Sequence, residues 1–216
     1  MPVGIRRRSL LATLLAVGTG LAIPALGIRS SRSAPDGSAD AARAFVTVLA
    51  RNAIAIMADS SLADSERIAK FRDLFVTSFD LLAIGQFVLG RHWRTASTEQ
   101  QARFLKLFER QQVLTWANRF KYFNGQKIAI ESADADTGNG WVVASHVDGL
   151  NGGPVPVSWR VAQSGDGWRV MDLSIEGVSL ALTLRQDFAA VLSSNGGQFD
   201  ALLAAMQSKI DQLGAG

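Results

Sequence analysis

The sequence contains no cysteine, one tyrosine and two histidines among its 216 residues. The lack of cysteine excludes disulfide bonds, thiolate zinc sites, thiol nucleophiles and a lipid anchor on an N-terminal cysteine. His92 and His146 belong to no His-x-x-x-His or His-Glu-x-x-His pattern, so they give little support to a metal site. The sequence also contains no Gly-x-Gly-x-x-Gly motif and no P-loop. We therefore predict a protein without a metal ion or a cofactor.

Two weak catalytic patterns remain. Residues 177–181, Gly-Val-Ser-Leu-Ala, approach the Gly-x-Ser-x-Gly nucleophile motif, but the fifth residue is alanine. Their neighbours favour Ser179 as the N-cap of a helix. Asp172 and Glu176 are two carboxylates close together in a largely apolar stretch, where we expect them to cap that helix or to pair with arginine. We predict no catalytic residue and no enzyme activity, with an enzyme using Asp172 or His146 as the alternative.

Acidic residues are missing from the first 33 positions, which carry five arginines. Arg6, Arg7 and Arg8 precede an apolar run from Leu10 to Leu26, an arrangement that is typical of a secretory signal. The paired arginines, followed by Ser-Leu-Leu, also resemble a twin-arginine export motif. The sequence favours export by the twin-arginine (Tat) route and leaves the general secretory (Sec) route open.

The apolar run is a poor membrane span, because it is short and is interrupted by glycines and by Pro24. We expect cleavage after Gly27 or after Ser33. The predicted organisation is a cleaved export signal at residues 1–33, a linker at 34–40 and a single domain at 41–216, located in the periplasm.

The positive net charge of the chain comes from this first segment. Residues 1–33 hold five of the 22 basic residues and none of the 19 acidic ones, which leaves 17 basic against 19 acidic side chains. The remaining chain lacks the excess of positive charge that binding to DNA or RNA requires, so we predict no nucleic-acid partner. Hydrophobic residues make up 48% of the sequence, with 11 Phe and 5 Trp, which excludes a disordered chain.

Helical periodicity occupies the segment before residue 125. On the first helix we expect an inward face formed by Phe45, Val48, Leu49 and Ile56. A second helix follows, and a third is predicted from the N-cap Asp80 to the terminal glycine Gly90. Residues 90–94 are expected to form the turn before a long fourth helix. That helix begins at Ser97, and either Ser97 with Gln100 or Thr98 with Gln101 fits a capping box.

The central segment changes to a period of about two residues. Four strands are predicted, at residues 127–132, 140–147, 155–163 and 168–176. After residue 177 the helical period returns in two helices, separated by Asn195-Gly196-Gly197. Helices, then an antiparallel sheet, then helices make an α+β fold.

The last two strands are predicted to pair through a four-residue hairpin loop at Ser164–Gly167. This loop would place Val161 opposite Val170, and Trp159 opposite Asp172. Alternation would then give one apolar face, formed by Val157, Trp159, Val161, Trp168 and Val170.

The order of these motifs resembles the MlaC family, also called the toluene-tolerance Ttg2D family of periplasmic phospholipid-binding proteins. The matching stretches are FDLLAIGQFVLGRHWRTASTEQQARFLKLF at residues 79–108, VPVSWRVAQSGDGWRVMDLSIEGVSLALTLRQDF at 155–188 and LLAAMQSKI at 202–210. The most specific parts are Leu-Gly-Arg-x-Trp-Arg followed by Thr-x-Glu-Gln, and Asp-x-x-Ile-Glu-Gly-Val-Ser. The resemblance extends from about Phe71 to the C-terminus.

The resemblance implies that N-terminal helices pack on a four-stranded antiparallel curved sheet and, with the C-terminal helices, enclose an apolar cavity. The resemblance further implies a soluble carrier that shuttles phospholipid between the outer and inner membranes. The partners it implies are an outer-membrane lipoprotein–porin complex and an inner-membrane ABC transporter with an MCE-domain subunit. Relatives also occur beside hopanoid-synthesis genes, so a polycyclic lipid is an alternative cargo.

On this basis we predict that the lipid contacts apolar side chains from both the helices and the sheet. These residues are Phe75, Phe79, Ile84, Phe87, Val88, Phe104, Phe108, Trp141, Val143, Val157, Trp159, Val161 and Val170. An interaction module with a filled core and an exposed apolar patch is the remaining alternative.

Overall fold

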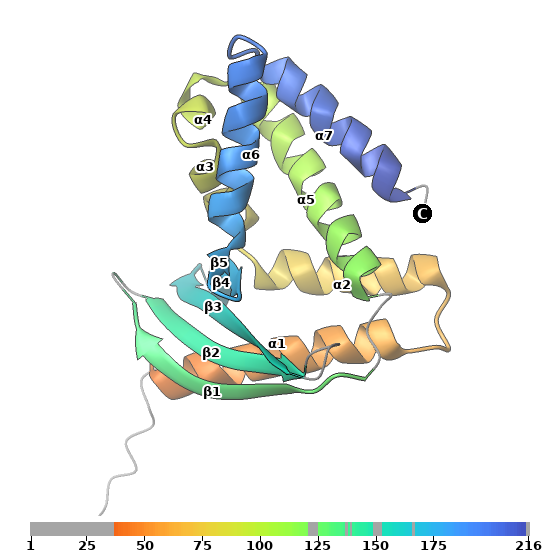
Figure 1. Ribbon diagram of the computed structural model, residues 1–216, viewed down its shortest axis with the longest axis vertical. Coiled ribbons are helices and arrows are strands. Elements are labelled where there is room, and N and C mark those ends of the chain that lie inside the picture. The colour runs from red at the N-terminus through yellow and green to blue at the C-terminus, as the bar shows by residue number, and fades with distance from the viewer. Residues whose placement is uncertain are drawn as a thin grey trace, which may run out of the picture. The chain divides into compact units, whose positions relative to one another are not determined.

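The computed structural model describes residues 37–120, 125–136, 138, 140–148, 153–165 and 167–214. The expected export signal and residues 34–36 of the expected linker lie outside these ranges. The helices are α1 (Ala39–Ala58), α2 (Asp64–Ser78), α3 (Leu81–Leu89), α4 (Arg91–Thr95), α5 (Thr98–Phe120), α6 (Leu180–Ser194) and α7 (Phe199–Gly214). The strands are β1 (Ile128–Ala135), β2 (Gly140–Asp148), β3 (Pro154–Ser164), β4 (Gly167–Ile175) and β5 (Val178–Ser179). Figure 1 shows the sheet with α1 along it and the helices α3 to α7 grouped beyond α2.

The strands form one antiparallel sheet in the order β1-β2-β3-β4-β5. This confirms the predicted α+β class and the four predicted strands. The prediction was incomplete in one respect, because the two-residue β5 adds a fifth strand beside the end of β4. A strand this short has no alternation pattern that the sequence could reveal.

The β3–β4 hairpin corrects two predictions of detail. Val161 lies opposite Val170 as expected, but Trp159 lies opposite Leu173, not opposite Asp172. A β-bulge causes this shift, since Met171 is an extra residue on β4 between two regular pairs. The pairing also continues to Ser164 and Gly167, so the connecting loop has two residues and not four.

The predicted N-caps of α3 and α5, Asp80 and Ser97, are confirmed. The Asp80 carboxylate accepts the Ala83 N–H at 2.9 Å at the start of α3. At the start of α5, the Ser97 hydroxyl accepts the Gln100 N–H at 3.2 Å, and the Gln100 side chain accepts the Ser97 N–H at 3.1 Å. This reciprocal pair is the first of the two predicted alternatives for the capping box.

The connection between α3 and α5 differs from the expected turn, because residues 91–95 form the short helix α4. Gly90 ends α3 with a φ of 53°, a conformation that favours glycine. A Cβ atom at this position would also lie 3.0 Å from the Arg185 guanidinium of α6. Gly90 therefore sets both the chain reversal and the close approach of α6.

Helix α1 presents the predicted inward face except at Val48, because Leu49 is buried and Phe45 and Ile56 pack against core side chains. Its buried residues are Ala42, Val46, Leu49 and Ala50, whereas Val48 is 53% exposed. Val48 was misplaced because the apolar residues of α1 surround much of the helix and do not define one stripe. Among the described residues, α1 is long and apolar enough to cross a membrane by length and composition, but its buried side packs on the sheet.

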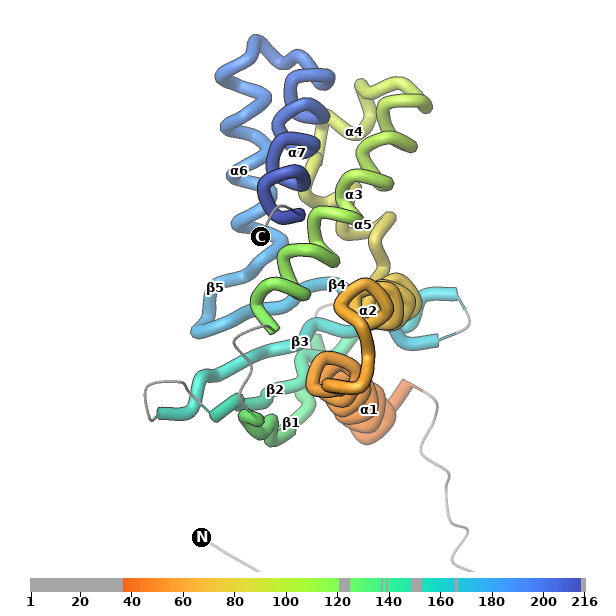
Figure 2. The backbone as a smooth tube through the Cα atoms, turned by 90° about the vertical axis from the view of Figure 1, so that its right-hand side faces the viewer, coloured from red at the N-terminus to blue at the C-terminus, as the bar shows by residue number. Residues whose placement is uncertain are grey.

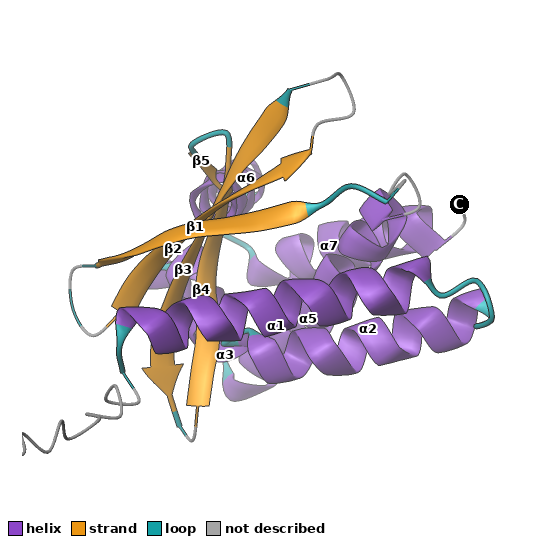
Figure 3. Ribbon diagram, turned by 90° about the horizontal axis from the view of Figure 1, so that it is seen from below, coloured by secondary structure: helices purple, strands orange, loops and turns teal. Residues whose placement is uncertain are grey.

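Two main groups of buried side chains hold the domain together. One fills the space between α3, α5, α6 and α7, where Phe104 contacts Phe108, Phe188 and Phe199. The other lies between α1 and the sheet, where Ala42, Val46 and Leu49 meet Val143, Val161 and Val170. Helix α2 runs beside α1 and connects the two groups through contacts with α5 (Figures 2 and 3). The sheet therefore has an apolar face, but α1 covers only part of it.

Candidate functional site

A large pocket lies where α1 stops covering the apolar face of the sheet. Its volume is about 800 Å³, which is within the range of small-molecule and lipid sites. The lining residues come from α1, from the C-terminal end of α5 and the segment after it, and from the ends of β1 to β4. They are Ala50, Ala53, Ile54, Trp116, Arg119, Phe120, Gln126, Ile128, Val147, Asp148, Gly153, Pro154, Val155, Val157, Trp159, Leu173, Ile175 and Glu176.

The pocket exists because only the first half of α1 packs directly on the sheet. The first half packs on the sheet through Val46 and Leu49. The second half faces the pocket with the small side chains of Ala50 and Ala53, together with Ile54. Small side chains leave space between α1 and the strands, and the sheet residues opposite them remain uncovered by protein.

Trp159 forms a fixed part of the pocket wall. Its indole Nε1 donates to the Ser145 hydroxyl at 3.0 Å, and that hydroxyl donates to the Val157 carbonyl at 2.9 Å. Ser145 is 2% exposed, and its buried hydroxyl has a hydrogen-bond partner both as a donor and as an acceptor. The hydrogen bonds hold the polar edge of the indole against β2 and leave the apolar ring at the pocket.

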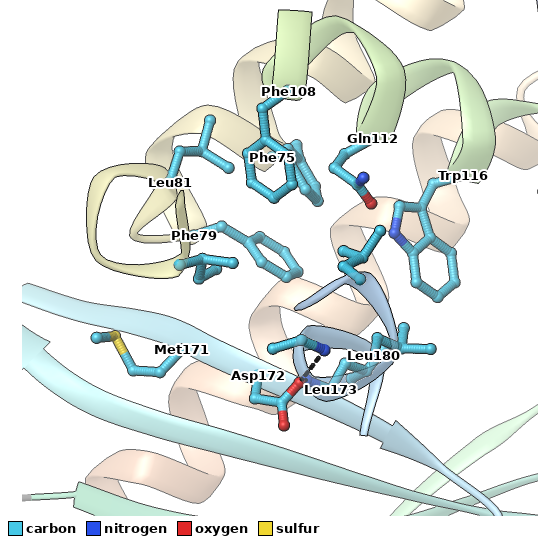
Figure 4. A pocket seen from close by; sticks show the side chains of 13 residues that line it. Phe75, Phe79, Leu81, Phe108, Gln112, Trp116, Met171, Asp172, Leu173 and Leu180 are labelled. Atoms are coloured by element: carbon cyan, nitrogen blue, oxygen red, sulfur yellow. Dashed lines mark hydrogen bonds between the residues drawn. The ribbon is translucent and has the colours of Figure 1, made fainter. Parts of the chain in front are cut away.

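A second, much smaller cavity of about 40 Å³ lies between α2, α3, α5, α6 and β4. Figure 4 shows that Phe75, Phe79 and Phe108 gather on one side of it, with Trp116 and Leu173 nearby. Phe75 and Phe79 stack with their ring centroids 4.2 Å apart. Trp116 and Leu173 line both cavities, so these two side chains separate the small space from the large pocket.

Asp172 and Ser179, the two residues of the weak catalytic patterns, cap the N-terminal end of α6. The Asp172 carboxylate accepts the Ser179 hydroxyl at 2.5 Å. It also accepts the Ala181 N–H at 3.0 Å, the dashed line in Figure 4. The Ser179 hydroxyl in turn accepts the Leu182 N–H at 3.1 Å, which confirms Ser179 as the N-cap. The hydrogen-bond partners of the Ser179 hydroxyl are the Asp172 carboxylate and the Leu182 N–H, and no histidine is among its partners in the described part of the chain.

His146 and the other possible metal ligands lie apart from the large pocket or from one another in the described ranges. His146 Nδ1 lies 2.7 Å from the Glu131 carboxylate at an exposed position on the sheet. In the part of the chain that the structure describes, no three His, Asp or Glu side chains are grouped to hold a metal ion.

Three charged residues line the large pocket: Arg119, Asp148 and Glu176. The Arg119 guanidinium lies over the Trp116 ring, 5.0 Å from its centroid. All three residues are at the ends of their elements or just beyond them, whereas the strand residues lining the pocket are mainly apolar. The pocket therefore combines an apolar interior with a charged edge.

Residues 48–208 match the family described as MlaC protein. The chain belongs to the MlaC family. Its relatives include the toluene tolerance protein Ttg2D of Pseudomonas putida, which is 30% identical over 51% of this chain and 51% of its own length. The intermembrane phospholipid transport system binding protein MlaC of Haemophilus influenzae is 27% identical over 59% of this chain and 61% of its own. The matches therefore span about half to three fifths of these relatives.

A solved structure matches more of the chain than these relatives do. The phospholipid-binding protein of Ralstonia solanacearum, determined in complex with a phospholipid, superposes with a TM-score of 0.71 and is 29% identical. The match covers 80% of this chain and 98% of the Ralstonia chain.

The thirteen predicted contact residues lie in five different places in the MlaC fold. Val157 and Trp159 line the large pocket, and Phe75, Phe79, Ile84 and Phe108 line the small cavity. Trp141, Val143, Val161 and Val170 pack with α1 in the sheet core, and Val88 and Phe104 pack in the helical core. Phe87 is 43% exposed, beside the Arg185 guanidinium.

Sequence reasoning missed the α1 and α5 walls of the pocket. The α1 wall consists of Ala50, Ala53 and Ile54. These residues precede the region of family resemblance, which begins at about Phe71, and alanines carry no signal of lipid contact. Trp116 and Phe120 were visible as large aromatic residues at the end of a long helix, which was the one available signal.

Proposed function

We propose that this protein is a lipid carrier that holds the acyl chains of a diacyl phospholipid in the large pocket. The observation that supports this most directly is the apolar pocket of about 800 Å³ between α1, α5 and the sheet. The phospholipid in the Ralstonia relative gives independent support, because that protein has the same fold.

The energetics require such a pocket. Removing one CH₂ group from water contributes about 0.8 kcal/mol. Leaving an acyl chain of roughly 15 carbons exposed to water therefore costs about 12 kcal/mol. A phospholipid that leaves a membrane must have this surface covered throughout its transfer. Val157, Trp159 and Ile54 supply apolar surface of the required kind.

Transport of this kind makes and breaks no covalent bond. A carrier therefore needs no catalytic residue, which agrees with the role of Asp172 and Ser179 in capping α6. The pocket itself offers no nucleophile with an adjacent base among its described lining residues.

We further propose that the protein works in the periplasm, between an outer-membrane lipoprotein–porin complex and an inner-membrane ABC transporter with an MCE-domain subunit. The name of the Haemophilus relative, an intermembrane transport system binding protein, supports this role. Replacing both Arg7 and Arg8 with lysine is expected to stop Tat export. An unchanged periplasmic yield would refute the twin-arginine route and leave the Sec route in place.

A transfer assay tests the carrier function. Donor vesicles carrying a fluorescent, self-quenched phospholipid are mixed with unlabelled acceptor vesicles, and the protein is expected to accelerate dequenching. Ala53 and Ala55 provide a matched pair on α1, because Ala53 lines the pocket and Ala55 is exposed. Ala53→Glu should abolish the acceleration, and Ala55→Glu should preserve it. Equal transfer by the two variants would contradict the assignment of the pocket.

A further inference from the structure

The charged edge of the large pocket is built from three separate elements. Arg119 stands near the C-terminal end of α5, Asp148 is the last residue of β2, and Glu176 follows β4. Asp148 lies opposite Pro154, and the Glu176 N–H donates to the Pro156 carbonyl at 2.9 Å. The two acidic residues therefore flank the beginning of β3, with backbones about 12 Å apart from two strand spacings of about 4.8 Å and a two-residue offset of about 3.3 Å per residue.

These charges have no ion-pair partner among the described residues. The ion pairs of the domain involve other side chains, and the Arg119 guanidinium rests on the Trp116 ring, 5.0 Å from its centroid. The Asp148 carboxylate accepts the backbone N–H of Lys127 at 3.4 Å, which leaves most of its acceptor capacity unused. One cation and two anions thus line an apolar pocket, and no ion pair joins them among the described residues.

We propose that this edge recognises a zwitterionic phospholipid headgroup, with Arg119 on the phosphate and Asp148 and Glu176 on the ammonium group. This inference rests on the proposed carrier function and specifies its cargo as lipids of the phosphoethanolamine type. Arginine suits the phosphate because its planar guanidinium presents several donors to the phosphate oxygens. Two carboxylates suit an ammonium group, which has three donors and a full positive charge.

The same edge disfavours an anionic headgroup such as phosphoglycerol. That headgroup offers its phosphate to Arg119, but it brings no cation to Asp148 and Glu176. Charge pairs at an exposed edge are weak and screened by salt, so the expected preference is modest, about two- to fivefold at low ionic strength.

The experiment is a competition between two lipids with identical acyl chains. The purified protein is incubated with an excess of vesicles of equimolar dioleoyl phosphatidylethanolamine and dioleoyl phosphatidylglycerol, then separated, extracted and analysed by lipid mass spectrometry. The bound ethanolamine lipid should exceed the bound glycerol lipid about two- to fivefold, and this ratio should approach one in about 0.5 M salt.

Variants separate the two halves of the edge. The double substitution Asp148→Asn with Glu176→Gln should bring the lipid ratio to one while total bound lipid stays unchanged. Arg119→Gln should lower the total of both lipids about twofold, in line with a weak exposed contact. Arg110→Gln, an exposed position on the same helix, and Asp187→Asn on α6 are controls that should match the wild type.

The outcomes distinguish the headgroup inference from the carrier function. Lipid captured by the wild type at the vesicle ratio, or a preference that survives the double substitution, would overturn the headgroup inference alone. A wild-type protein that captures neither lipid would overturn the carrier function and the headgroup inference with it. The salt series needs no variant, so it stays informative if a substituted protein fails to fold.

Discussion

Two valines on β3 offer a sharp test of where core ends and pocket begins. Val157 and Val161 are four residues apart on the same face of the same strand. Val161 is fully buried against α1 in the sheet core, and Val157 lines the large pocket. Replacing each valine with aspartate applies the same chemical change to two environments that the structure treats as different.

The expected costs differ by several kcal/mol. At Val161 the substitution loses about 2 kcal/mol of apolar burial and places a carboxylate without partners in a closed core, which costs about 2–7 kcal/mol more. Native domains are stable by about 5–15 kcal/mol, so Val161→Asp should unfold the protein or nearly so. Val157 is also buried, at 7% exposure, but it lines the pocket, so a carboxylate there has a route to water that Val161 lacks, and we expect a smaller loss of about 1–3 kcal/mol.

The assay combines urea unfolding with lipid extraction and mass spectrometry on each variant. Val157→Asp should remain folded but copurify without phospholipid, because a charged group in the pocket repels acyl chains. Val157→Ala is the control for the loss of the side chain itself and should keep its lipid. The reasoning is refuted if Val157→Asp unfolds while Val161→Asp does not, or if Val157→Asp retains wild-type lipid.

Three further substitutions test other parts of the structure. Trp116→Leu opens the partition between the two cavities, so the mean acyl length of bound lipid should increase; an unchanged length distribution would argue against a connected space. Asp172→Asn and Ser179→Ala should each lower stability by about 0.5–2 kcal/mol in urea unfolding and leave lipid transfer intact; lost transfer in a folded variant would give these residues a functional role. The Ser97 hydroxyl donates to Glu99 at 2.8 Å and holds the pKa of that carboxylate below its ordinary value, so Ser97→Ala should raise this pKa in an NMR titration. An unaltered pKa would show that another group sets it.

Local signals in the sequence were sufficient for most element boundaries. Asp80, Ser97 and Ser179 were identified as helix caps because an N-cap depends on a side chain bonding its own neighbouring backbone. The strands were found because alternation and turn residues are also local properties. The bulge at Met171 was not found, since one extra residue hardly disturbs the alternation of the strand around it.

The site was harder to predict because a pocket is defined by what fails to cover a surface. Val157, Trp159 and Val161 have the same alternation and the same apolar character, so the sequence assigned all three to one lipid-contacting face. The difference between them is set by α1, whose first half packs on Val161 and whose second half leaves a space over Val157 and Trp159. That difference depends on helix placement, which no property of β3 encodes.

Resemblance to the MlaC family supplied the function that residue chemistry alone did not. The matched region, residues 48–208, includes the end of α1 that faces the pocket as well as the α5 residues Trp116 and Phe120. The structure adds which of these side chains border the space and which of the predicted contacts, such as Phe104, are core.

The central claim is that the pocket between α1, α5 and the sheet carries a phospholipid. The most direct measurement is organic extraction of the purified native protein, followed by lipid mass spectrometry and a phosphate-to-protein ratio. We predict diacyl phospholipid in stoichiometric amounts from the wild type, and none from the folded Val157→Asp variant. A folded wild-type protein that yields no lipid, or yields a polycyclic lipid in place of a diacyl phospholipid, would contradict this account.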